Sequence, residues 1–196
     1  MSKSQIITGL DVGTNYVRVV VASQGLPSLS QASQLEILGV GHSKSQGLRK
    51  GVVINIEATV DSISKAVSEA ETLSGHKIKS LAVACSGSHI KSLNSHGVVG
   101  VKGSEVSQND VEKVIDAAKA VAIPVDRELM HVLPQEYIID GQDGIMQPIG
   151  ISGVRLESRV HLITGSATSN QNIIKCISRC GTVSYTHLTL PTNREV

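Results

Sequence analysis

The chain has 196 residues, with 18 lysines and arginines against 17 aspartates and glutamates, so its net charge is +1. This balance argues against a polybasic nucleic-acid surface, and the 2% of aromatic residues argues against platforms for base stacking, so we expect no nucleic-acid partner. With 40% hydrophobic residues but no Phe or Trp, the core must be built from Val, Ile, Leu and Ala.

The first half of the sequence predicts an α/β unit. Strands are expected at 6–10, 16–22, 35–41 and 80–85, the last as a nearly continuous apolar run. Between the third and fourth strands, Asn55 can cap a helix whose apolar residues recur at helical spacing until Gly75.

The middle of the sequence predicts a small α+β unit of its own. Strands are expected at 88–93 and 97–101, joined as a hairpin, and at 129–133, 136–139 and 154–164. Ser107 and Asp110 have the spacing of a capping box for a helix that ends before Pro124. A last helix is expected at 170–180 and ends at Gly181. Segments of the α/β unit therefore precede and follow the small α+β unit, as they would around an inserted domain.

The cysteines and the hydropathy pattern indicate a cytoplasmic protein. Cys176 and Cys180 lie four residues apart on a predicted helix, where a disulfide is awkward, and the total of three is odd. Asp11 and Arg18 interrupt the first apolar stretch, so we expect no signal peptide, and no run reaches the length of a membrane span.

The stretch Gly9-Leu-Asp-Val-Gly-Thr-Asn15 carries the strongest chemical signal. In a glycine turn between two strands, backbone amides, Thr14 and Asn15 can face phosphate oxygens, and Asp11 can hold Mg²⁺ through water. A plain tight hairpin explains the same spacing, so both interpretations stay open. Arg49 and Lys50 are interpreted as solvated loop residues, with a phosphate or an acidic partner as the alternative.

This hairpin resembles the first phosphate loop of the superfamily that contains actin, sugar kinases and heat-shock chaperones. Within it, the chain is similar to the FtsA family of actin-like bacterial cell-division proteins from about Ile7 to Gly181. Five stretches, specific in their order and spacing, carry the similarity: Ile37–Gly41, Gly47–Gly51, Ser86–Ile90, His131–Tyr137 and Pro148–Arg155.

The resemblance implies an α/β fold made of an actin-like (ribonuclease H-like) subdomain 1A, incomplete, with a small α+β subdomain 1C (SHS2-like) inserted into it. Subdomain 1A would comprise residues 1–85 and 164–181, and subdomain 1C residues 86–163. Residues 182–196 resemble translated vector sequence appended to a truncated reading frame, so they are left out of the predicted fold.

The resemblance also implies a scaffold, not an enzyme. It would bind ATP with Mg²⁺, form filaments through subdomain 1C, tether the FtsZ ring to the cytoplasmic face of the inner membrane at the division site and recruit later division proteins. Asp11, Gly13, Thr14 and Asn15 would form its phosphate loop. The second phosphate loop, the FtsZ-binding subdomain and a C-terminal membrane helix would be missing, so we expect this chain to bind ATP weakly or not at all.

Other members of the superfamily remain as alternatives. A phosphotransferase or a chaperone-type ATPase would continue its first domain without an insertion after residue 85. An actin-like protein of pilus assembly shares the insertion. The stretches around His131 and Pro148 favour the division protein.

Overall fold

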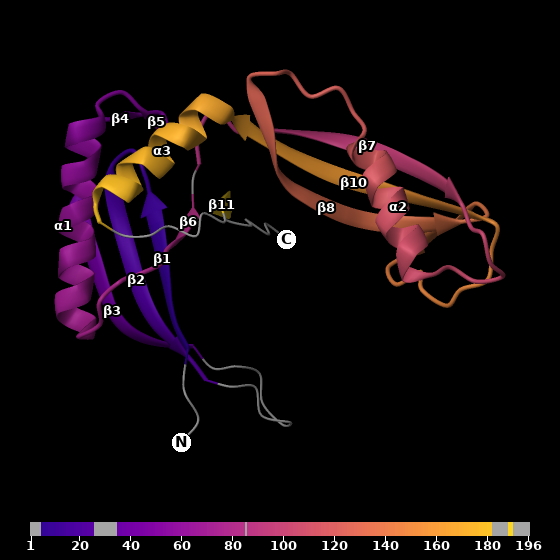
Figure 1. The fold of residues 1–196 in the computed structure, drawn as a ribbon, viewed down its shortest axis with the longest axis horizontal. Helices are drawn as coiled ribbons and strands as arrows, with labels where there is room; N and C mark the ends of the chain where they lie inside the picture. Colours follow the sequence, from indigo (N-terminus) through magenta and orange to yellow (C-terminus); the bar gives the residue numbers. More distant parts are fainter. Residues whose placement is uncertain (1–4, 26–34, 85, 182–187, 190–196) are drawn as a thin grey trace. The chain divides into compact units, whose positions relative to one another are not determined.

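A computed structural model describes residues 5–25, 35–84, 86–181 and 188–189, and the chain divides into two compact units. The first unit combines Met1–His89 with Thr168–Val196, and the second is Ile90–Ala167 (Figure 1). The second unit therefore starts four residues later than the expected insertion at 86. The reason is that Gly87 lies against Lys50 and Gly51 of the first unit.

The first unit is built on a five-stranded sheet. Its strands are β1 (Gln5–Val12), β2 (Tyr16–Gln24), β3 (Leu35–Lys44), β6 (Ala82–Ala84) and β11 (Leu188–Thr189). They lie in the order β11-β6-β1-β2-β3, where β1, β2 and β3 pair antiparallel and β6 runs parallel to β1. The short β11 pairs parallel with β6, within the segment that sequence analysis had left out of the fold.

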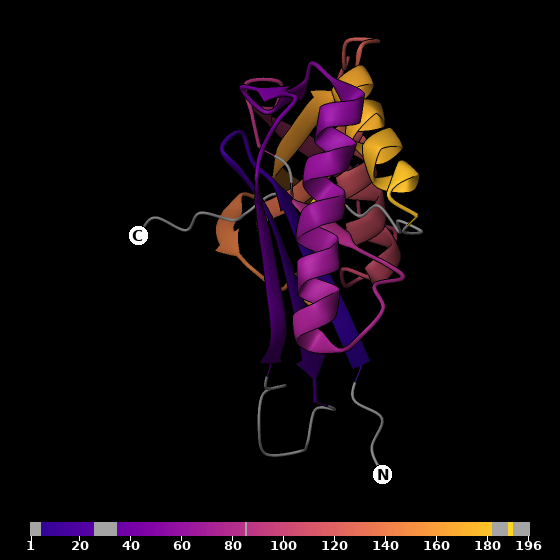
Figure 2. The same ribbon diagram turned by 90° about the vertical axis from the view of Figure 1, so that its left-hand side faces the viewer.

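Helices α1 (Ile56–Ser74) and α3 (Ala167–Arg179) lie side by side in the first unit (Figure 2). The predicted caps of α1 are confirmed: the Asn55 side chain accepts from the Ala58 amide, and Gly75 ends the helix in the left-handed conformation. A Cβ on Gly39 of β3 would lie 2.7 Å from the Ser74 nitrogen, so glycine lets α1 approach the strand closely.

The core between this sheet and the two helices is aliphatic, as the composition predicts. Its apolar side chains with at most 1% exposure are Leu10, Val12, Val17, Val19, Val21, Ile63, Ala66, Ala70, Leu81, Val83, Ile173, Cys176 and Ile177. A separate two-stranded hairpin, β4 (Leu48–Arg49) and β5 (Val52–Val53), precedes α1.

The second unit is a four-stranded antiparallel sheet with one helix on it. Its elements are β7 (Lys91–Gly100), α2 (Gln108–Lys119), β8 (Arg127–Ile139), β9 (Gln142–Ile145) and β10 (Arg155–Ser166), in the sheet order β7-β10-β8-β9. The predicted capping box is confirmed, because Ser107 and Asp110 each bond the other's backbone amide. Val111, Val114 and Ala118 of α2 are buried in clusters that include Leu156, Val160 and Leu162 of β10.

Two strand predictions in the second unit were wrong. The expected hairpin at 88–101 is one continuous strand, β7, with no turn between 93 and 97, and Gly97 is a site of close approach to α2. The expected strands on either side of Pro134 are also one strand, β8, which takes the proline at a register shift in its pairing with β10.

Among the described residues, no helix combines the length and the apolar character that crossing a membrane requires.

Candidate functional site

The predicted phosphate loop joins β1 to β2 at the edge of the first sheet. Leu10 and Val12 of β1 are buried, and Asp11 between them therefore points to the opposite face of the sheet. The Asp11 carboxylate is 46% exposed and lies 3.5 Å from the Arg18 guanidinium, which in turn lies over the Tyr16 ring. This surface ion pair leaves the carboxylate accessible to a hydrated cation.

Gly13 serves the geometry of the turn. Its amide donates to the Tyr16 carbonyl oxygen at 3.1 Å, and a Cβ here would lie 2.8 Å from the same oxygen. The glycine is thus required by the hairpin, as the plain interpretation of the motif expected. Its amide is committed to the turn, which reduces the number of backbone donors that can face an anion.

Thr14 and Asn15 contact two more distant segments. The Thr14 hydroxyl oxygen accepts from the Gly51 amide at 3.2 Å, and the Asn15 carbonyl oxygen accepts from the Ser45 amide at 2.9 Å. The Asn15 residue is exposed, and its side-chain amide has no partner within the described ranges. The loop therefore presents one fixed hydroxyl and one free side-chain amide.

The segment that follows β6 also lies beside the phosphate loop, where it packs against Gly51. β6 runs parallel to β1 with Ala84 beside Asp11, so the residues after β6 emerge next to the phosphate loop. There, Gly51 packs so closely against Ser86 and Gly87 that a Cβ on Gly51 would overlap the Ser86 carbonyl oxygen. The carboxyl ends of neighbouring parallel strands are a common location of ligand sites in α/β proteins.

The site fits Mg²⁺ only in the hydrated form that sequence analysis expected. No group of three or more His, Cys, Asp or Glu side chains that could hold a metal occurs in the described parts of the chain. Mg²⁺ keeps several waters and often uses one carboxylate together with phosphate oxygens of a ligand. Asp11 is the residue that would hold such an ion.

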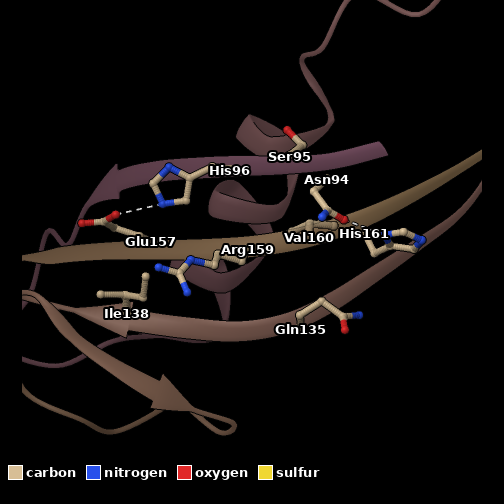
Figure 3. A pocket seen from close by; sticks show the side chains of 9 residues that line it. All are labelled: Asn94, Ser95, His96, Gln135, Ile138, Glu157, Arg159, Val160 and His161. Atoms are coloured by element: carbon tan, nitrogen blue, oxygen red, sulfur yellow. Dashed lines mark hydrogen bonds and ion pairs between the residues drawn. The ribbon is translucent and has the colours of Figure 1, made fainter. Parts of the chain in front are cut away.

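The second unit carries a cavity of about 600 Å³ that sequence analysis did not predict (Figure 3). It lies over β7, β10 and β8, and the residues that line it are Asn94, Ser95, His96, Gln135, Ile138, Glu157, Arg159, Val160 and His161. The Glu157 carboxylate contacts His96 at 2.8 Å and Arg155 at 2.9 Å, and Arg159 pairs with Glu136. The alternation of polar and apolar residues from Arg155 to Leu162 is the sequence signal for this face.

The cysteines of α3 are not candidate nucleophiles. Burial raises the pKa of Cys176 to about 11, and burial also raises the pKa of Cys180. The Cys180 thiol donates to the carbonyl oxygens of Cys176 and Val60. Both thiols thus stay protonated near neutral pH and act as small packing groups.

Comparisons with known proteins identify the second unit and extend across most of the chain. A family profile described as "SHS2 domain inserted in FTSA" matches residues 87–164. The cell division protein FtsA of Pseudomonas aeruginosa is 47% identical over 181 residues, and that of Borreliella burgdorferi is 52% identical over 178 residues. These alignments cover 92% and 90% of this chain, and the chain spans 42% of the length of each relative.

A solved structure supports the fold independently. A chain from the "PilM-PilN type IV pilus biogenesis complex" matches with a TM-score of 0.62 at 14% identity, over 94% of this chain and 47% of that one. At this identity the likeness shows the fold alone, and it confirms the predicted α/β, actin-like architecture with an SHS2-like insertion. With FtsA proteins at 36% to 52% identity along nine-tenths of its length, the chain is recognised by its similarity to the FtsA family of cell division proteins.

Proposed function

We propose that this chain is part of an actin-like scaffold of bacterial cell division. In this proposal the intact protein binds ATP with Mg²⁺, polymerises through the second unit, tethers the FtsZ ring to the cytoplasmic face of the inner membrane and recruits later division proteins. The identity of about half of the residues to FtsA proteins carries the proposal. FtsZ binding and membrane attachment are assigned to the 58% of the relatives' length that this chain does not span.

The geometry of the β1–β2 loop supports the nucleotide part of the proposal. An accessible carboxylate on Asp11, an anchored hydroxyl on Thr14 and a free amide on Asn15 lie on one turn beside the end of β6. These groups suit a hydrated Mg²⁺ ion and phosphate oxygens. We assign the loop a binding role without catalysis, so that nucleotide controls the polymer state and no phosphoryl acceptor is required.

A chimaera tests this function in cells. Residues 5–181 replace the matching segment of the Pseudomonas aeruginosa FtsA, and the chimaera is expressed in that bacterium while its own FtsA is depleted. We expect septation to be restored. The same chimaera with Asp11→Ala should leave filamentous cells, whereas Asp61→Ala, which removes an exposed carboxylate from α1, should divide normally.

Two outcomes would contradict the proposal. A chimaera that is stable and abundant yet leaves cells undivided would argue against the scaffold function of this segment. Normal division with Asp11→Ala, at equal protein levels, would show that the Asp11 carboxylate is not part of the nucleotide site, and it would leave the scaffold assignment in place.

A further inference from the structure

The turn between β4 and β5 has an unusual backbone. Its two central residues, Lys50 and Gly51, both have positive φ, at 52° and 77°. Two-residue hairpin turns of this kind strongly prefer Asn, Asp or Gly, because other side chains are strained in the left-handed region. Lysine at the first position is therefore retained against a local conformational cost.

Gly51 ties this turn to the candidate phosphate loop. Its amide donates to the Thr14 hydroxyl oxygen at 3.2 Å, and a Cβ on Gly51 would lie 2.8 Å from the Gly87 Cα and overlap Ser86. Positive φ and close approach both exclude a side chain at this position. The contact to Thr14 therefore depends on glycine.

The bond from Gly51 determines what Thr14 can do. A threonine hydroxyl has one hydrogen to donate and two lone pairs to accept with. One lone pair takes the Gly51 amide, and no other partner of this hydroxyl occurs among the described residues. The hydroxyl hydrogen thus remains available to an anionic oxygen, while the Gly51 bond restricts its orientation.

Lys50 adds a positive charge at the same turn. The residue is exposed, and within the described ranges its ammonium group has no carboxylate partner. It directly precedes Gly51 in sequence, so its flexible stem starts one residue from the amide that bonds Thr14. An unpaired ammonium group on such a stem is suited to phosphate oxygens.

We propose that the Lys50–Gly51 turn completes the phosphate site, with Lys50 binding phosphate oxygens of the nucleotide and Gly51 positioning the Thr14 hydroxyl. This inference rests on the nucleotide binding proposed above and adds two residues to it. The substrate class is a nucleoside triphosphate with Mg²⁺. Of the alternatives that the sequence left open for Lys50, it selects the phosphate contact over the solvated loop.

Nuclear magnetic resonance on the 196-residue chain tests the binding role of Lys50. The ¹⁵N-labelled chain is titrated with Mg-ATP into the millimolar range, where weak binding is measurable, and the amides of Gly13, Thr14 and Gly51 should shift together. Lys50→Asn removes the charge and relieves the strained φ, so it should keep or raise thermal stability and weaken binding about tenfold. Lys79→Asn, at another exposed lysine of the first unit, should bind like the parent.

A second measurement tests the Gly51–Thr14 contact without any ligand. Thr14→Val removes the hydroxyl and should accelerate hydrogen exchange of the Gly51 amide, whereas Thr14→Ser keeps the hydroxyl and should leave exchange near the parent rate. In the titration, Thr14→Ser should also retain binding that Thr14→Val loses. This rescue by serine separates positioning from simple packing.

The outcomes distinguish this inference from the function on which it rests. Amide shifts in the parent with equal affinities for Lys50→Asn and Lys79→Asn would overturn the role of Lys50 and leave nucleotide binding intact. Unchanged Gly51 exchange in Thr14→Val would overturn the positioning contact. No shift at any of the three amides at millimolar Mg-ATP would overturn this inference, whereas nucleotide binding by the intact protein is judged separately by the chimaera with Asp11→Ala.

Discussion

Replacing Gly97 by alanine should destabilise the second unit by about 3 kcal/mol, the upper end of the cost of overpacking a core. Gly97 lies in β7 beneath α2, where a Cβ would overlap the Val114 carbonyl oxygen and stand 2.8 Å from the Ala118 nitrogen. Ordinary contact begins at 3.4 Å, so α2 would have to withdraw by more than about 0.6 Å. The neighbours are backbone atoms, which cannot rotate away as a flexible side chain can.

The helix has little freedom to make that movement. The side chains of Val114 and Ala118 have no exposed area, and the Ser95 hydroxyl donates to the Ala118 carbonyl oxygen at 2.7 Å. Moving α2 outward would open space beneath both side chains and lengthen this bond. Because cavities and lost contacts in a core each cost free energy, relaxation of the helix lowers the strain only in part.

Gly100→Ala is the matched control. It lies in the same strand, and nothing stands within 4 Å of a Cβ at that position. This substitution should be neutral or stabilising by about 0.5 kcal/mol, since alanine lowers the entropy of the unfolded chain. Urea unfolding followed by hydrogen-exchange mass spectrometry on peptides of Ile90–Ala167 reports this unit alone. If the two variants differ by less than about 0.5 kcal/mol, the close-approach argument is wrong.

Three further predictions concern a helix cap, a carboxylate and a thiol. Ser107→Ala should cost about 1 kcal/mol in urea unfolding, because Ser107 caps α2, and Ser107→Thr should recover most of it; equal losses would refute the cap. Hydrogen bonds from the Lys77 side chain and from the Ile78 amide hold the pKa of the Glu71 carboxyl below its usual 4.5, so the ionised form of Glu71 stabilises the fold. That stability is complete well above pH 4.5 and is lost as pH falls through the lower pKa of the folded state. Glu71→Gln should therefore lower the free energy of unfolding at pH 7, and the difference from the parent should shrink on acidification. A difference that stays constant with pH would contradict this prediction. At pH 8 a thiol with a pKa of about 11 is ionised to about one part in a thousand, so iodoacetamide should label Cys176 far more slowly in the folded chain than in urea, and equal rates by mass spectrometry would exclude burial.

Local sequence signals predicted those elements whose causes are local. Asn55 and Ser107 cap the helices that their spacing indicated, because a cap is decided by residues within one turn. The other four strands of the first sheet and its two helices were likewise visible as apolar patterns in the sequence. In contrast, β11 lies in a segment that was left out of the predicted fold because it resembles vector sequence, and its pairing with β6 depends on a strand about a hundred residues earlier.

Glycine and proline misled where their role is non-local. The sequence predicts a turn just before Gly97, although this glycine lies in mid-strand because α2 needs the space of its missing side chain. Pro134 predicts a break between two strands, although a register shift in the pairing with β10 accommodates it within β8. Both residues are common in turns, so sequence alone favours the commoner explanation.

The candidate site shows the same division between local and distant causes. The first strand was expected to end at residue 10, whereas β1 continues to Val12 and its alternation places Asp11 on the face opposite Leu10 and Val12. The partner of Thr14 was not predictable, because Gly51 lies 37 residues away and reaches it only through two consecutive residues with positive φ. The Gly51 amide bonds Thr14, and the space of its missing side chain is filled by Ser86 and Gly87. Glycine that is needed for close approach between distant segments therefore identifies this site more sharply than the glycine of the motif itself, since Gly13 is explained by its own hairpin.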